Sequence, residues 1–346
     1  MSTVTLNMAG TGASIRRLWG VAIAVLVAGT LGFGIAFFEE AKRAFEVWDE
    51  STAYNHCFLI LPIVAYLIWE RWRALYARAP EPTFWPFVAM VPVGLVWLFA
   101  DNAKIMEGRQ LAAMTLFELF VFALLGRKVW RVAAFALLYL YFLVPAGAFV
   151  TPALQTFAAR FAVKGVELLG IPIYSDGYNI EVPGAKFEVA EACAGLRFLI
   201  ASVALGTLYG YTMYRSWKRR VAFIVVSIVV PIIANGFRVL GIVVLGWILG
   251  NAQAAVADHL IYGWVFFSLV SLILILLGLP FRQAVPAFPV TPVEPRDAGR
   301  QQIGIAVVGG VTILFVIVLT RPFVAHGPLG LAMGAAASAL KHMLGH

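Results

Sequence analysis

The sequence predicts an all-α polytopic membrane protein with about eight to nine transmembrane helices. Of its 346 residues, 62% are hydrophobic and only 13% are charged, whereas an ordinary soluble domain has about 25% charged residues. Apolar stretches recur along the whole chain, and a spanning helix needs about 20 mostly apolar residues. The first stretch is long enough to stay in the membrane as an anchor, so we expect no cleaved signal peptide.

The candidate spans are taken in order along the chain. They are residues 18–38, 56–69, 84–100, 111–125, 132–150, 195–213, 221–249, 260–280 and 303–320. The stretch 221–249 is longer than one crossing requires, and Asn235-Gly236 is where we expect it to break. It then either crosses once and continues as a re-entrant or interfacial half, or crosses twice.

Basic residues divide unevenly between alternate loops. The N-terminus and residues 70–82, 126–131, 214–220 and 281–302 together carry 15 Lys and Arg, and the opposite segments carry 10. The positive-inside rule therefore places the first set in the cytoplasm. This topology accounts for the formal net charge of +8, so the lipid bilayer is the expected partner and nucleic acid is not.

Residues 151–194 form the one sizeable segment predicted outside the membrane. Apolar residues at helical spacing in 152–169 indicate an amphipathic helix in the interface. Residues 178–182 and 185–189 alternate apolar and polar around Pro183-Gly184, which predicts a small β-ribbon. We expect three parts of the chain: a multi-spanning core (1–280), a Pro-rich cytoplasmic linker (281–302), and a final spanning helix with a short tail (303–346).

Three reactive side chains mark predicted membrane boundaries. Cys193, one of two cysteines, lies where the polar segment becomes a helix, and Arg238 and His259 lie at comparable boundaries downstream. A thiol, a guanidinium and an imidazole at one face indicate cysteine-based acyl transfer. The three share a face only if 221–249 crosses once.

Other polar residues are possible supporting residues. Asn235 and Arg197 lie close in sequence to Arg238 and Cys193, while Glu191 either orients the imidazole, binds substrate or is a solvated acid. His56 either supports the site or bonds within the bundle. Glu118, inside an apolar stretch, is expected to pair structurally, with Arg197 as a candidate partner. Two cysteines and five dispersed histidines show no metal-ligand spacing, so we expect neither metal nor cofactor.

Three motifs resemble the exosortase/archaeosortase family over residues 45–280. They are Glu-Ala-Cys-Ala-Gly-Leu-Arg (191–197), Ala-Asn-Gly-Phe-Arg-Val (234–239) and Asp-His-Leu-Ile-Tyr-Gly-Trp (258–264). A fourth, Tyr-Asn-His-Cys-Phe-Leu-Ile-Leu-Pro-Ile (54–63), is weaker, since Asn55 and Cys57 replace the family's usual Ser and Gly beside His56.

The resemblance implies a cysteine transpeptidase of the bacterial inner membrane, with its active site facing the periplasm. Its substrates would be exported, membrane-anchored proteins with a C-terminal sorting signal of the PEP-CTERM type: a Pro-Glu-Pro-like motif, an apolar helix and a basic tail. Cys193 would be the nucleophile that forms a thioester, Arg238 the oxyanion stabiliser and His259 the general acid/base. The acceptor is left open between water, lipid and a sugar amine.

Two functions of other classes remain. A transporter would use the intramembrane residues Glu118, Arg197 and Arg238 to line a path, and would be expected to show paired broken helices. A non-catalytic subunit of envelope polysaccharide assembly would tolerate loss of the Cys193 thiol.

Overall fold

A computed structural model describes residues 2–250, 259–284, 297–320 and 338 of the chain, and it leaves aside the side chains of 2–13, 259–262 and 264. The chain divides into two compact units. Unit 1 comprises Met1–Glu50, Cys57–Pro145 and Ala287–His346, and unit 2 comprises Ser51–His56 and Ala146–Pro286. The predicted linker (281–302) and the tail after residue 320 lie largely outside the described residues.

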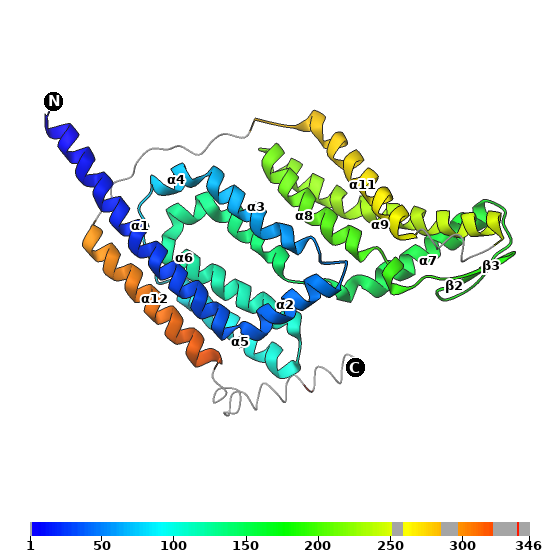
Figure 1. The fold of residues 1–346 in the computed structure, drawn as a ribbon, viewed down its shortest axis with the longest axis horizontal. Coiled ribbons are helices and arrows are strands. Elements are labelled where there is room, and N and C mark those ends of the chain that lie inside the picture. Colours follow the sequence, from blue (N-terminus) through cyan, green and yellow to red (C-terminus); the bar gives the residue numbers. More distant parts are fainter. Residues whose placement is uncertain (1, 251–258, 285–296, 321–337, 339–346) are drawn as a thin grey trace. The chain divides into compact units, whose positions relative to one another are not determined.

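Unit 1 is built of helices. Its elements are α1 (Ser2–Ala36), α2 (Phe38–Glu50), α3 (Cys57–Glu70), α4 (Trp72–Tyr76), α5 (Pro86–Ala103), α6 (Met106–Leu138), η1 (Tyr139–Leu143) and α12 (Ala298–Thr320). The first and last of these helices, α1 and α12, lie side by side although they are far apart in the sequence (Figure 1). The helix α5 packs along α6.

A kink divides α6 at Gly126, within the region predicted as two spans joined by a loop at 126–131. Gly126 has φ 74° and ψ 171°, which only glycine adopts readily. A Cβ there would lie 1.9 Å from the carbonyl oxygen of Glu81. The neighbouring carbonyls of Ala123 and Leu125 accept hydrogen bonds from the backbone of Thr83 and Glu81. The chain therefore changes direction at a single residue and needs no longer loop.

Unit 2 combines helices with a small sheet. Its elements are η2 (Ala148–Val150), α7 (Thr151–Leu168), β1 (Tyr174–Asp176), β2 (Asn179–Val182), β3 (Ala185–Glu188), η3 (Glu191–Cys193), α8 (Leu196–Met213), α9 (Trp217–Leu249), α11 (His259–Gly278) and η4 (Leu279–Phe281). The strands form an antiparallel sheet in the order β1-β2-β3. The two predicted ribbon strands are present as β2 and β3, and the structure adds β1, which the sequence analysis did not foresee.

The sheet packs against α7 and the C-terminal part of α9. Ile180 and Val182 of the sheet share a buried cluster with Ala162 of α7 and Val243 of α9. Small alanines on α7 allow this close approach, because bulkier side chains at those positions would separate the layers. In Figure 1 the sheet lies at the end of α7 and α9, and α8 and α11 run alongside α9.

The helix α9 corrects one prediction. It runs unbroken over 33 residues from Trp217 to Leu249, so the break expected at Asn235-Gly236 is wrong. Gly236 serves close packing instead, since a Cβ there would lie 2.8 Å from the ring of Phe161. A helix of this length spans about 50 Å, which exceeds the roughly 30 Å of a bilayer core.

The membrane character of the chain is confirmed, but the count of eight to nine spans is not. In the described part of the chain, five helices are long and apolar enough to cross a membrane, or up to six if Met106–Leu143 and Ala148–Leu168 form one broken span. Two further apolar helices, Cys57–Glu70 and Val265–Phe281, are shorter. At 14 residues, α3 extends only about 21 Å.

Candidate active site

Cys193 ends a short turn that joins the sheet to α8. Its backbone N–H donates to the carbonyl of Ala190 at 2.8 Å, and α8 begins three residues later at Leu196. Gly195 between them has φ 85°, and a Cβ there would lie 2.6 Å from Cγ of Asn235. Only glycine meets both demands, the left-handed backbone and the close approach. The half-buried thiol of Cys193 therefore lies two residues before a position that requires glycine.

Asn235 of α9 connects that loop to Arg238. Its Nδ2 donates to the backbone carbonyl of Cys193 at 2.8 Å, and its Oδ1 accepts a long hydrogen bond of 3.5 Å from Nη1 of Arg238. The side chain is 2% exposed. Asn235 of α9 therefore ties the turn η3, which ends at Cys193, to the guanidinium of Arg238 one turn further along α9.

Arg238 is a buried cation whose charge has no carboxylate partner among the described side chains. It is 2% exposed, and its Nε lacks a hydrogen-bond partner. The guanidinium lies over the ring of Phe198, 5.5 Å from the centroid. Gly263 of α11 also borders it, since a Cβ at Gly263 would lie 3.5 Å from Nη2. A desolvated charge without a counter-ion is costly, and an anionic or carbonyl oxygen beside this guanidinium would reduce that cost.

A second guanidinium lies on the same aromatic ring. Arg197, half-buried, has its Cζ 5.4 Å from the centroid of Phe198. Phe198 in turn stacks on Phe267 of α11 at 4.8 Å. The aromatic pair thus fixes α8 to α11, and it holds two cations by cation–π contact next to the thiol's loop.

Glu191, His56 and His259 lie in three different segments of the chain. Glu191 is exposed in η3. His56 is half-buried in the turn before α3, and Ser51–His56 belongs to unit 2, like Cys193. His259 begins α11, one turn before Gly263, but its side chain lies outside the described residues. The structure therefore brings Cys193, Asn235 and Arg238 together, and the place of the imidazole stays a prediction.

The expected pair of Glu118 and Arg197 is not observed. Glu118 belongs to unit 1 and Arg197 to unit 2. Both carboxylate oxygens of Glu118 are buried without a hydrogen-bond partner in the described part of the chain.

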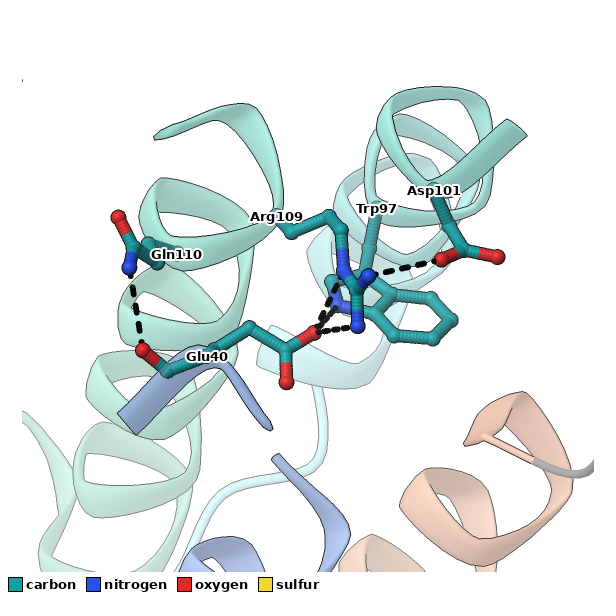
Figure 2. Close-up of polar contacts among 5 residues, drawn as sticks. All are labelled: Glu40, Trp97, Asp101, Arg109 and Gln110. Atoms are coloured by element: carbon teal, nitrogen blue, oxygen red, sulfur yellow. Dashed lines mark hydrogen bonds and ion pairs between the residues drawn. The ribbon is translucent and has the colours of Figure 1, made fainter. Parts of the chain in front are cut away.

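A polar cluster in unit 1 was missed by the sequence analysis. Arg109 contacts Oε1 of the buried Glu40 through Nε and Nη2, both at 2.9 Å, and contacts Asp101 through Nη1 at 3.1 Å (Figure 2). The indole of Trp97 also donates to Glu40, at 3.0 Å, and Gln110 donates to its backbone carbonyl. The only sequence signal was a charged residue at the end of each apolar stretch, which predicts a boundary but no partner.

Phe198, Phe267 and Gly263 were also missed, because aromatic and glycine residues inside apolar helices are ordinary packing residues in a sequence. In the part of the chain that the structure describes, no three His, Cys, Asp or Glu side chains are grouped so that they could hold a metal ion.

The chain was compared with protein families, curated proteins and solved structures. Residues 48–276, well over half of the chain, match the family of the transmembrane exosortase. The chain belongs to that family. Neither the curated proteins nor the solved structures gave a match.

The exosortase match confirms the resemblance seen in the motifs. It extends from residue 48 to residue 276, which takes in η3, α8, α9 and nearly all of α11, and it therefore includes all the residues predicted to act in the site. Glu40, at the centre of the other polar cluster, lies outside it, as does α12. The polytopic membrane protein is thus an exosortase-family protein, and the part that matches the family carries the Cys193 thiol and the buried Arg238.

Proposed function

We propose that this exosortase-family protein is a cysteine transpeptidase that cleaves the C-terminal sorting signals of exported proteins. The observation that carries the proposal is the link Cys193–Asn235–Arg238. It joins the loop of a half-buried thiol to a buried guanidinium that has no carboxylate partner among the described residues.

The proposed reaction begins with the thiolate sulfur of Cys193 attacking a peptide carbonyl of the substrate. The carbonyl oxygen takes up the negative charge, and Arg238 stabilises it with the Nε–H that has no internal partner. When the tetrahedral intermediate collapses, the C–N bond breaks, and His259 gives a proton to the leaving amine. This leaves a thioester on Cys193 and a neutral imidazole.

The second half of the reaction releases the acyl group. The neutral His259 removes a proton from an acceptor O–H or N–H, and the acceptor attacks the thioester carbon while Arg238 again stabilises the oxyanion. The C–S bond breaks and the thiolate returns. Water as acceptor gives hydrolysis, whereas an amine gives transpeptidation.

The length of α9 supports a site at the periplasmic face of the inner membrane. From Trp217, next to the basic segment 214–220, to Arg238 the helix rises about 32 Å, close to the roughly 30 Å of the hydrocarbon core. The residues after Arg238, among them Val239 and Val243, pack against the sheet. We therefore propose an inner-membrane protein with 214–220 in the cytoplasm and Cys193 facing the periplasm.

The test is co-expression with a substrate that ends in a sorting signal, followed by measurement of cleavage. We expect Cys193→Ala to lower processing by about 10⁴-fold or more, as loss of a nucleophile does in other covalent hydrolases. A thioester of wild-type protein should be released by hydroxylamine and be absent from the variant.

The matched control is Cys57→Ala, at the other cysteine of the chain. Cys57 is 1% exposed and its Sγ donates to the carbonyl of Phe142, so its loss should leave processing per folded molecule unchanged. Processing by Cys193→Ala at the wild-type rate would instead favour a non-catalytic role.

A further inference from the structure

A groove of about 1010 Å³ lies between α7 and α9 in unit 2. Its walls are mainly apolar and include Phe157, Phe161 and Leu168 of α7, with Phe237 and Leu240 of α9. Asn235 and Arg238 do not line it. The groove is therefore a feature separate from the candidate active site, although α9 contributes to both.

Several apolar side chains of the groove are exposed on the protein surface. Leu168 is 87% exposed, Phe237 57% and Phe157 39%. The face of α7 that carries Ala158 and Ala162 is by contrast buried against the sheet and α9. A helix with one packed face and one exposed apolar face is typical of the membrane interface. We therefore expect a hydrocarbon chain to occupy this groove.

Two cations stand on the same helix as this apolar wall. Arg160 and Lys164 line the groove, are exposed, and are four residues apart, which puts them on one face of α7. Neither makes an ion pair with any carboxylate that the structure describes. The other lysine of this region, Lys186, is paired with Glu181 at 2.8 Å. The groove thus combines an apolar surface with two exposed positive charges that form no ion pair with the described residues.

We propose that this groove binds an anionic phospholipid. The acyl chain lies along Phe157, Phe161 and Phe237, and the phosphate contacts Arg160 and Lys164. Charge-assisted hydrogen bonds to phosphate favour an arginine–lysine pair of this kind, and each basic side chain near an anionic headgroup adds attraction. The charges thus provide the reason to prefer an anionic over a zwitterionic headgroup.

An extended acidic peptide fits the groove less well. Its backbone would need hydrogen-bond partners, and the lining hydroxyl, Thr156, already bonds the carbonyl of Pro152 and the hydroxyl of Tyr178. An acyl chain makes no such demand. An apolar groove with two cations at its edge therefore fits an anionic lipid better than an acidic peptide.

The experiment measures lipid selectivity of the purified full-length protein in vesicles that contain spin-labelled phosphatidylglycerol or phosphatidylcholine. We expect motionally restricted phosphatidylglycerol to exceed phosphatidylcholine at the wild-type protein. The double variant Arg160→Gln/Lys164→Gln should reduce that preference by roughly 10-fold at the site, with an unchanged thermal midpoint. Ala153→Trp, which fills the groove and keeps both cations, should reduce the restricted fraction of either lipid.

The control variant is Lys42→Gln/Arg43→Gln, which removes two exposed cations of α2 that already pair with Glu46. It should leave the selectivity intact. Equal restriction of both lipids at the wild-type protein, or full selectivity in the Arg160/Lys164 variant, would overturn the proposal. The proposal would also be overturned if the Arg160/Lys164 variant lost binding of an acidic peptide but retained its binding of phosphatidylglycerol. Because the readout is lipid mobility, failure here leaves the transpeptidase proposal untouched.

Discussion

Arg109 in unit 1 and Arg238 in unit 2 are both withdrawn from solvent, yet their surroundings differ completely. Arg109 is held by two carboxylates, those of Glu40 and Asp101, and lies over the ring of Trp97, 5.6 Å from its centroid (Figure 2). Each of its three guanidinium nitrogens contacts a carboxylate oxygen. The desolvation cost of this cation is therefore offset within the protein itself.

Arg238 has no such compensation. It contacts one amide oxygen, at 3.5 Å, and the face of Phe198, and the described residues provide it with no carboxylate. Removing a cation from water without a counter-ion costs stability, and folds keep such groups mainly where function requires them. Burial of an arginine does not by itself indicate a site, whereas burial without a counter-ion makes Arg238 the stronger candidate of the two.

The largest effect is expected when arginine is replaced by lysine at each of the two positions, 238 and 109. Arg238→Lys should lower processing of a sorting-signal substrate by about 10²-fold or more, because lysine cannot aim planar donors at the oxyanion. Arg109→Lys should process normally per folded molecule but unfold at a lower temperature, because one ammonium cannot reproduce the contacts that three guanidinium nitrogens make with Glu40 and Asp101. Processing rates and thermal midpoints of both purified variants provide the measurement.

The reverse outcome would break the comparison. If Arg238→Lys processed at the wild-type rate, Arg238 would leave the mechanism and at most a Cys193–His259 dyad would remain. A processing defect in Arg109→Lys that exceeded its loss of folded protein would give the unit 1 cluster a role in catalysis.

A smaller effect is expected at the carboxylate of the compensated cluster. Glu40→Gln keeps the shape but removes the charge that accepts from Arg109 and Trp97, so we expect a loss of about 2 kcal/mol in the free energy of unfolding. Denaturation in detergent micelles measures it. Glu46→Gln on the same helix removes only exposed pairs with Lys42 and Arg43 and should cost less than about 1 kcal/mol. Equal losses in both variants would show that the buried cluster is no stronger than a surface pair.

Local sequence patterns were enough for the parts of the fold that depend on local chemistry. The alternation in 178–182 and 185–189 predicted β2 and β3 because a two-residue turn follows from Pro183-Gly184. Cys193 was expected at a helix start, and α8 does begin three residues later. Apolar stretches likewise predicted membrane helices, although 56–69 proved shorter than a usual span.

Features that depend on tertiary contact could not be predicted in this way. Asn235-Gly236 reads as a turn in isolation, but in α9 the glycine makes room for Phe161 and the asparagine reaches Cys193. The pairing of Glu40 with Arg109 joins residues 69 apart, and no local period relates them. Glu118 was assigned a partner from sequence, and the fold places that partner in another unit.

The smallest effect, and the most discriminating, is expected from Asn235→Asp. Aspartate has nearly the same shape as asparagine, keeps an oxygen near Arg238 and thereby supplies the missing counter-ion. It also loses the Nδ2 donor to the carbonyl of Cys193. We expect processing to fall about 10-fold, equivalent to roughly 1.4 kcal/mol, because a paired guanidinium stabilises an oxyanion less well and the thiol's loop loses one hydrogen bond. Thermal stability should change little, since the new ion pair offsets the lost hydrogen bond.

Gln110→Glu is the matched change in unit 1. It converts a 5% exposed amide beside the compensated Arg109 into a carboxylate, and it should not alter processing per folded molecule. If Asn235→Asp processed as fast as wild type, the uncompensated charge of Arg238 would not be what the reaction uses, and its burial would require another explanation.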